Sequence, residues 1–359
     1  MIILDSTVAL ITDIHFDCRG GSQFFLDRYQ DFFDNQFFPD LLAKGIKTVI
    51  CLGDTWENRK SIGVNSLHYA KRMFFDKLQS NGIKLICILG NHDVVYKNTN
   101  DVNSMEIVES AYDNVTLVTD TATVQVGNYT IDLVSWINNE NYQSRLEFIT
   151  KSASNICAGH FEINGFEMTA GHYCETGLGL DLFEKYQATW SGHFHIRSQI
   201  GNVQYLGNPF QTNRGDTGSS RGYHIFDGNT GNLTFVKNNY EIYSSIKFND
   251  SIDLTTYDFQ QYKNKIVIVD VVSLLDCNTR LLNLFCEKLS SVAYKVEINE
   301  TVGSVKVTDI TDHESFKTHT ELMAEYVDST IVSDNESIRP LLKNILNTLY
   351  NEATANTRV

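Results

Sequence analysis

The sequence predicts an α/β protein in which parallel strands are covered by helices. Three apolar runs, at residues 7–11, 46–52 and 83–89, are typical of buried strands. Each is closely followed by a short polar motif: D-I-H, G-D-T-W-E and G-N-H-D, in that order. Between the runs, residues 22–44 and 65–81 have apolar side chains at helical spacing. This alternation of strands and helices is typical of a parallel sheet with helices on its faces.

The middle of the chain predicts shorter strands. We expect them at residues 122–126, 129–135, 155–159, 187–192, 203–207, 222–226 and 233–236, with a helix near 141–153. The pair Gly127-Asn128 separates the first two strands and is typical of a hairpin turn. The segment D-G-N-T-G-N at 227–232 predicts a second tight turn.

After about residue 245 the motifs stop and a smaller α+β region is predicted. It contains a strand at 265–273, a helix at 279–291 and strand-like runs near 292–298 and 303–309. The final apolar stripe, at 338–349, predicts a helix that packs either on its own domain or on a partner.

The composition limits the class of protein. A chain of 359 residues with 42% hydrophobic side chains has room for two domains and a sizeable core. No apolar run is long enough to cross a bilayer, and the N-terminus lacks the features of a secretory signal. The seven cysteines show no C-x-x-C spacing, which predicts reduced thiols in a cytoplasmic protein. We therefore expect a protein that is neither secreted nor membrane-spanning nor a zinc finger.

The net charge of −15 disfavours a protein that coats nucleic acid through an overall positive field. It leaves open a protein that contacts a few phosphates locally. It also leaves open a protein whose metal ions supply positive charge that the sum omits.

The polar motifs carry a candidate metal centre at the carboxyl ends of the predicted strands, where α/β sheets bind their ligands. The candidate side chains are Asp13, His15, Asp54, Asn91, His92, His160, His193 and His195. Carboxylate oxygens and imidazoles in this mixture favour divalent cations of the Mn, Fe or Zn type. In an extended D-x-H or H-x-H segment both outer side chains point the same way, so each pair can serve one cluster. A carboxylate such as Asp54 can bridge two cations, which together can clamp a phosphoryl group.

Other residues are left with two interpretations. His172 is the alternative to His160, and we otherwise expect His172 and His68 to be structural or to face solvent. His224, His313 and His319 lie in no motif, and we expect no role in the site for them. Residues 22–42 contain more apolar and aromatic side chains than one helix face needs, and they either fill a core or form part of a dimer contact.

The five motifs D-I-H, G-D-T-W-E, G-N-H-D, G-H and G-H-F-H span residues 13–195 and resemble the signature of the calcineurin-like metallophosphoesterases. The later segments Y-L-G-N-P-F-Q at 205–211 and R-G-Y at 221–223 resemble elements of the nuclease subunits of SbcCD-type repair complexes. Among these, it resembles especially the recombination endonuclease subunits of T-even-like phages. It departs from the pattern at Asn208, where serine is usual, and in its negative net charge.

This resemblance implies a four-layer α/β sandwich in which helices flank two sheets. It also implies three parts: a nuclease domain at 1–245, a small α+β DNA-binding cap at 246–325, and a helical tail at 326–359 that docks an ATPase partner. One metal would be held by Asp13, His15, Asp54 and His195, and the other by Asp54, Asn91, His160 and His193. His92 would contact the scissile phosphate or the leaving oxygen, oriented by Asp93. The family prefers Mn²⁺, with Mg²⁺ as a poorer substitute.

The implied function is a two-metal DNA nuclease of recombination and double-strand-break repair. It would act as a 3′→5′ exonuclease and a single-strand endonuclease on DNA ends and single strands. Its partners would be a second copy of the chain and a coiled-coil ATPase of the SMC type, and no membrane would be involved. The protein would act in the cytoplasm, which is that of the host if it is phage-encoded. The chain has no G-x-x-x-x-G-K-[ST] loop, so any ATP hydrolysis would come from that partner. Two alternatives remain: a phosphatase or small-molecule phosphodiesterase of the same superfamily, and a DNA-end scaffold without catalysis.

Overall fold

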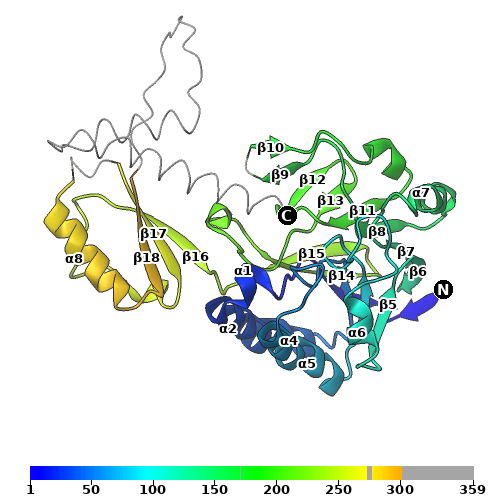
Figure 1. Cartoon of the computed structure of the whole chain (residues 1–359), viewed down its shortest axis with the longest axis horizontal. Helices are drawn as coiled ribbons and strands as arrows, with labels where there is room; N and C mark the ends of the chain where they lie inside the picture. Colours follow the sequence, from blue (N-terminus) through cyan, green and yellow to red (C-terminus); the bar gives the residue numbers. More distant parts are fainter. Residues whose placement is uncertain (170, 273–276, 301–359) are drawn as a thin grey trace, which may run out of the picture. The chain divides into compact units, whose positions relative to one another are not determined.

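A computed structural model describes residues 1–169, 171–272 and 277–300. Two sheets face one another, and helices cover their outer faces (Figure 1). One sheet has six strands in the order β15-β14-β2-β3-β4-β5, and the other has seven in the order β1-β6-β7-β8-β11-β13-β12. Smaller sheets are formed by β9 with β10 and by β16, β17 and β18. The predicted fold class, a four-layer α/β sandwich, is confirmed for this part of the chain.

The elements have the following bounds. The strands of the six-stranded sheet are β2 (Thr7–Ile11), β3 (Thr48–Cys51), β4 (Lys84–Ile88), β5 (Val115–Val118), β14 (Gly222–Asp227) and β15 (Asn232–Lys237). Those of the seven-stranded sheet are β1 (Ile2–Leu4), β6 (Thr121–Val126), β7 (Tyr129–Val134), β8 (Ile156–His160), β11 (Ala188–Gly192), β12 (Ser198–Ile200) and β13 (Val203–Tyr205). The remaining strands are β9 (Glu167–Thr169), β10 (His172–Tyr173), β16 (Tyr243–Lys247), β17 (Ile266–Val271) and β18 (Lys295–Glu300).

The α-helices are α1 (Cys18–Gly21), α2 (Gln23–Phe32), α3 (Phe38–Ala43), α4 (Val64–Ala70), α5 (Asp76–Ser80), α6 (Met105–Glu109), α7 (Tyr142–Lys151) and α8 (Thr279–Ser290). Two π-helical segments, Phe33–Phe37 and Lys71–Phe75, join α2 to α3 and α4 to α5. Each pair of helices therefore forms one long rod, as the apolar spacing predicts. Among the described residues, no helix is both long and apolar enough to cross a lipid bilayer.

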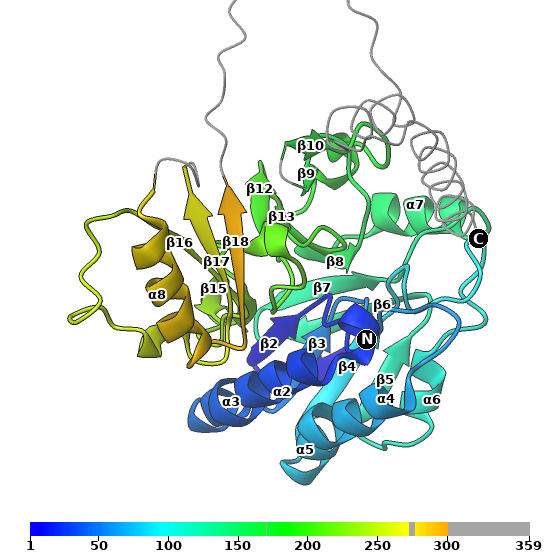
Figure 2. The same ribbon diagram turned by 60° about the vertical axis from the view of Figure 1, so that its left-hand side comes forward.

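Successive side chains along a strand point to opposite faces of its sheet and so belong to different layers of the core. On β2, Val8 and Leu10 face the seven-stranded sheet, whereas Ala9 and Ile11 face the helices. Helices α2 to α5 cover the outer face of the six-stranded sheet, and α7 packs on that of the seven-stranded sheet (Figure 2). Strands β2 to β5 pair in parallel, and so do β7, β8, β11 and β13.

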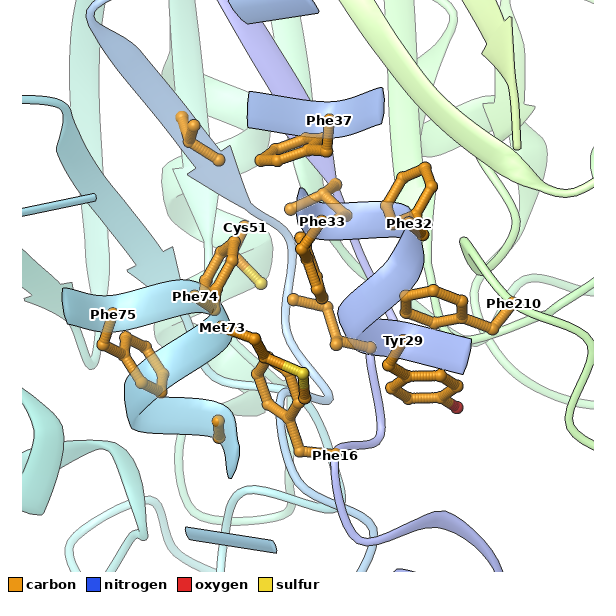
Figure 3. Close-up of a cluster of buried hydrophobic side chains, with 14 of the residues drawn as sticks. Phe16, Tyr29, Phe32, Phe33, Phe37, Cys51, Met73, Phe74, Phe75 and Phe210 are labelled. Atoms are coloured by element: carbon orange, nitrogen blue, oxygen red, sulfur yellow. The ribbon is translucent and has the colours of Figure 1, made fainter. Parts of the chain in front are cut away.

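The aromatic side chains of 22–42 fill a core. Phe32, Phe33 and Phe37 are completely buried, and Tyr29 stacks on Phe210 at 3.6 Å between ring centroids. Figure 3 shows Phe33 and Phe37 beside Phe74 of the second helical rod, and Phe74 in turn contacts Phe75. The π-helical turn rotates the apolar face partway along the rod. Aromatic residues can therefore occupy more of the circumference than one straight stripe and still be buried.

The region after residue 242 forms a separate three-stranded sheet, in which β16, β17 and β18 are parallel. Helix α8 covers one face of it with Leu282, Phe285 and Leu289, and the side chain of Asn278 caps the helix by accepting from the Leu281 amide. The strand-like run near 303–309 and the helix expected at 338–349 lie outside the described residues. Cys18, Cys51, Cys87, Cys157 and Cys174 are buried free thiols.

Candidate metal and catalytic centre

The predicted site residues follow the carboxyl ends of five strands that belong to the two facing sheets. Asp13 and His15 follow β2, Asp54 follows β3, and Asn91 and His92 follow β4 in the six-stranded sheet. His160 ends β8, and His193 and His195 follow β11 in the seven-stranded sheet. These carboxyl ends meet at one edge of the sandwich, where the side chains of both sheets come together.

The backbone at this edge is strained. Asp13, His15, Asp54 and His193 have φ between 51° and 91°, and only two other non-glycine residues in the described part of the chain have positive φ. A positive φ costs most L-residues free energy, and it persists where the surrounding structure imposes it. Here the loops after β2 and β3 are bonded to each other, because the amides of Asp13 and His15 donate to the carbonyls of Gly53 and Asp54.

Glycines allow the loops after β3 and β4 to touch. Gly53 has a φ of +90°, and a Cβ there would lie 2.6 Å from the Gly90 nitrogen. A Cβ on Gly90 would in turn collide with the Asp54 carboxylate. This close approach brings Asp54 to the centre of the site and explains why G-D-T-W-E and G-N-H-D each begin with glycine.

One half of the site gathers Asp13, His15 and His195. A ligand atom from each of these residues lies within 4.8 Å of those of the other two. The Nε2 atoms of His15 and His195 are 3.1 Å apart, and Asp54 Oδ2 lies 3.8 Å from His15 Nε2. Asp13 Oδ1 lies 4.0 Å from His195 Nε2.

The other half gathers Asp54, Asn91, His160 and His193. Asp54 Oδ2 lies 3.3 Å from His160 Nε2, so the same oxygen faces both halves. Asn91 Oδ1 lies 3.1 Å from His160 Nε2 and 2.8 Å from His193 Nδ1. His172 is exposed on β10, outside both groups. His160, and not His172, therefore lies among the candidate ligands of this half.

The donor set fits two divalent cations, because the rings of His15, His160 and His193 each face a further polar group outside the cluster. His160 Nδ1 lies 2.8 Å from the Leu52 carbonyl oxygen, to which it donates. His15 Nδ1 lies 2.9 Å from Glu57 Oε2, and His193 Nε2 lies 3.9 Å from Glu162 Oε2. Outer carboxylates and carbonyls of this kind orient metal-ligating histidines.

The charges of the cluster are strongly coupled. Burial opposes the charged form of His15, but Glu57, Asp54 and Asp13 outweigh it and raise the pKa of His15 to about 9. Burial and Asp54 compete in the same way at His160, whose pKa is also raised to about 9. Burial works against the ionised form of Asp54, yet His160 and His15 hold its pKa well below the usual range. Protonated rings thus carry the positive charge that the buried carboxylates require, a role that cations can take over.

His92 and Asp93 differ from the sequence-based expectation. The His92 ring is oriented by the Glu57 carbonyl oxygen, 2.5 Å from Nδ1, and not by Asp93. Both oxygens of Asp93 accept backbone N–H bonds instead, from Thr55 and Trp56 on one side and from Gly90 on the other. Asp93 is fully buried beneath these loops. Its carboxylate therefore joins the loops after β3 and β4, and the predicted contact with the ring was wrong.

Other residues of the site could not be recognised from the motifs alone. Glu57 belongs to G-D-T-W-E, but only the structure shows that its carboxylate faces His15 while its carbonyl faces His92. Arg221 donates to the His195 carbonyl and pairs with Asp216 at 2.6 Å. It also donates to Asn208, so the residue that replaces the usual serine takes part in this buried support.

Comparison with known proteins places the chain in a family. The model of the calcineurin-like phosphoesterases matches residues 6–197, the segment that contains all five motifs. The chain belongs to the calcineurin-like phosphoesterases. Members of this family use divalent metals, and the two groups of candidate ligands described above agree with that chemistry.

A curated relative extends the similarity beyond the family segment. Exonuclease subunit 1 of Enterobacteria phage T4 is 31% identical over 310 residues, which cover 86% of this chain and 88% of the relative. The resemblance inferred from the motifs, to this phosphoesterase family and to a phage nuclease subunit, is confirmed. A solved archaeal phosphodiesterase is 10% identical, covers 64% of this chain and 99% of its own, and has a TM-score of 0.33.

Proposed function

We propose that this phosphoesterase is a two-metal DNA nuclease that acts as a 3′→5′ exonuclease and a single-strand endonuclease. The observation that carries the proposal is the placement of Asp54 Oδ2 between His15 Nε2 at 3.8 Å and His160 Nε2 at 3.3 Å. One carboxylate oxygen shared by two sets of donors is what a two-metal phosphodiester hydrolase requires. The similarity to a phage exonuclease subunit supports DNA as the substrate.

We assign the ligands as the motifs imply. Asp13, His15, Asp54 and His195 would hold one cation, and Asp54, Asn91, His160 and His193 would hold the other. The mixture of oxygen and imidazole donors suits Mn²⁺, with Mg²⁺ as a poorer substitute. When bound, the two cations would activate the attacking water and neutralise charge on the phosphoryl oxygens.

His92 acts on the leaving group in this proposal. Its Nδ1–H donates to the Glu57 carbonyl, which leaves Nε2 as the nitrogen that can meet a substrate oxygen. Its amide donates to Asp54 Oδ1 at 2.8 Å, so the motif that carries His92 is tied to the bridging carboxylate. A protonated Nε2 can give its proton to the leaving 3′ or 5′ oxygen, or stabilise the charge that develops there. Asp93 keeps the loop in place from beneath.

The rest of the chain would connect this activity with partners. We propose residues 1–245 as the nuclease domain, 246–325 as a DNA-binding cap and 326–359 as a segment that docks a coiled-coil ATPase of the SMC type. Two nuclease subunits and two ATPases would form the active assembly, in the cytoplasm, for recombination and break repair. The net charge of −15 fits an assembly in which the partner supplies much of the attraction for DNA.

The same net charge favours a second candidate, a phosphodiesterase of small substrates. One experiment separates the two functions. Purified full-length protein is incubated with 5′-end-labelled linear duplex DNA, with single-stranded DNA and with bis(p-nitrophenyl) phosphate, in Mn²⁺, in Mg²⁺ or in EDTA. We expect Mn²⁺-dependent shortening from the 3′ ends and internal cuts in single strands.

Two variants link any activity to the proposed site. Asp54→Ala and His193→Ala should abolish DNA cleavage, whereas the matched changes Asp101→Ala and His68→Ala alter exposed residues outside the site. Hydrolysis of bis(p-nitrophenyl) phosphate without DNA cleavage would transfer the function to small substrates. DNA cleavage that persists in Asp54→Ala would reject the site itself.

A further inference from the structure

A cavity of about 320 Å³ lies directly beside the half of the site that contains His160. His160 is part of its wall, together with Trp136, Tyr142, Glu162 and Leu178. None of the catalytic roles proposed above uses Trp136 or Tyr142. The cavity therefore adjoins the place where a phosphodiester would be cut, and its lining needs an explanation of its own.

The Trp136 ring stands against two of the proposed metal ligands. Its centroid is 5.9 Å from that of His160 and 5.3 Å from that of His193. The backbone of Trp136 is anchored on both sides: its amide donates to the Leu89 carbonyl at 2.8 Å, and its own carbonyl accepts from Asn100 and Asn141 at 3.0 and 3.1 Å. The backbone that carries the ring is thus anchored beside the proposed ligands before any substrate arrives.

The charge of the lining limits what the cavity can accept. Glu162 supplies the carboxylate of the lining. Its Oε1 accepts a hydrogen bond from Thr176 Oγ1 at 3.1 Å, and its Oε2 lies 3.9 Å from His193 Nε2. A second phosphate would be repelled by this group. A flat, neutral ring that can stack on an indole and carries N–H groups suits both Trp136 and Glu162.

We propose that this cavity receives the unpaired nucleobase next to the phosphate under attack, stacked on Trp136 with Tyr142 at the opening. Tyr142 is 47% exposed at the start of α7, where it can close over a ring that has entered. A base in the cavity has left its duplex stack. The protein should accordingly prefer single-stranded or frayed ends. This inference rests on the proposed nuclease function and adds the form of DNA that the site accepts.

Tryptophan fluorescence tests binding without any cleavage. Of the three tryptophans in the chain, Trp56 is 0% and Trp190 is 3% exposed, so Trp136 is the one that a ligand can reach. The full-length protein with Mg²⁺ is titrated with thymidine 5′-monophosphate and, separately, with 2-deoxyribose 5-phosphate. We expect quenching by the nucleotide alone and its loss in Trp136→Phe. Equal quenching by both compounds, or none by the nucleotide, would overturn the proposal.

A substrate that lacks one base tests the same contact during cleavage. Two single-stranded oligonucleotides are compared, one natural and one with a tetrahydrofuran abasic residue at the 3′ end. Stacking on an aromatic side chain predicts that the wild type cuts the natural end roughly 5- to 150-fold faster. The ratio should fall towards one in Trp136→Ala and Tyr142→Ala, and Tyr142→Phe should restore it. Ser144→Ala, on the same helix but outside the cavity, should leave the ratio unchanged.

The two measurements separate the failure of this inference from that of the proposed function. If DNA is not cut but bis(p-nitrophenyl) phosphate is hydrolysed, the nuclease function fails, and fluorescence still decides whether a nucleoside enters the cavity. If DNA is cut with no preference for the natural end, the nuclease stands and the base-binding cavity is rejected.

Discussion

Asp54 is the residue on which both halves of the proposed metal site depend. Its Oδ2 faces His15 and His160, and its Oδ1 accepts the His92 amide. The side chain is 2% exposed, so its charge has almost no water around it. A buried carboxylate of this kind is stable only when cationic groups surround it. Metal binding should therefore be more sensitive to this residue than to any ligand that serves one half.

Asp54→Asn should weaken the binding of both cations by more than about 100-fold, since loss of residues that merely orient ligands already costs 10- to 100-fold. Calorimetric titration with Mn²⁺ should give two ions for the wild type and none at micromolar concentrations for the variant. Asp101→Asn, an exposed change of the same kind, is the control. Two tightly bound ions in Asp54→Asn would disprove the bridging role.

His92→Ala should behave in the opposite way. The ring lies outside both ligand groups in our assignment, so the variant should still bind two Mn²⁺ ions. Its rate of DNA cleavage should fall by about 10²- to 10⁴-fold, the usual contribution of a general acid or base. Both quantities can be measured on one preparation, with His68→Ala as the matched control. Full cleavage activity in His92→Ala would show that the leaving group needs no help from this ring.

The raised pKa values of His15 and His160 predict how metal binding depends on pH. Both pKa values are about 9 in the metal-free protein, so both rings are protonated at neutral pH. A cation binds the neutral imidazole and must displace these protons. Apparent Mn²⁺ affinity should rise as pH increases from 7 towards 9 and then level off. Titrations in buffers of different ionisation enthalpy should detect proton release at pH 7.5, and its absence would contradict the assignment.

At the scale of elements, the two π-helical segments explain how the helical rods carry so many aromatic residues. Phe33–Phe37 and Lys71–Phe75 lie at the middle of their rods, and Phe33 meets Phe74 at 5.1 Å between ring centroids. This packing covers the outer face of the six-stranded sheet, which contains β2, β3 and β4 and the loops that follow them. The rods therefore support the strand ends that present Asp13, Asp54 and Asn91.

Phe33→Ala should destabilise the fold by about 3–5 kcal/mol, because it leaves a cavity among rings that cannot fully collapse. Chemical denaturation followed by circular dichroism measures this difference. Leu42→Ala, on the same rod but 45% exposed, should change the stability by no more than about 0.5 kcal/mol. Equal effects of the two substitutions would mean that the aromatic cluster does not stabilise this layer.

At the scale of the whole molecule, the site exists because two sheets present their carboxyl edges at the same place. Asp13, Asp54 and Asn91 come from one sheet, and His160 and His193 come from the other. The core between the sheets joins Leu10 and Leu52 to Ala158, so the two sets of ligands are positioned by packing as well as by their loops. Cations bound at this edge would link the sheets, and their removal should affect the stability of the described fold.

Chelation should lower the unfolding temperature. A ligand that binds only the folded state stabilises it by about 2.7 kcal/mol at a concentration 100 times its dissociation constant. Thermal unfolding should therefore shift upward when Mn²⁺ is added to EDTA-treated protein. The shift should disappear in Asp54→Asn and persist in Asp101→Asn. A wild-type protein that unfolds at the same temperature with and without Mn²⁺ would show that no cation links the sheets.

The sequence by itself determined the order of the motifs, the alternation of strands and helices, and the set of candidate ligands. It could do so because a buried strand and a tight loop impose local requirements on residue type, as in the apolar run before Gly53 and Asp54. Only the tertiary structure decided which atoms meet. It placed His160, and not His172, beside Asp54, turned Asp93 away from His92 and brought Glu57, Glu162 and Trp136 to the site. The physical reason is that these contacts join residues on different strands, and packing across two sheets sets their distances.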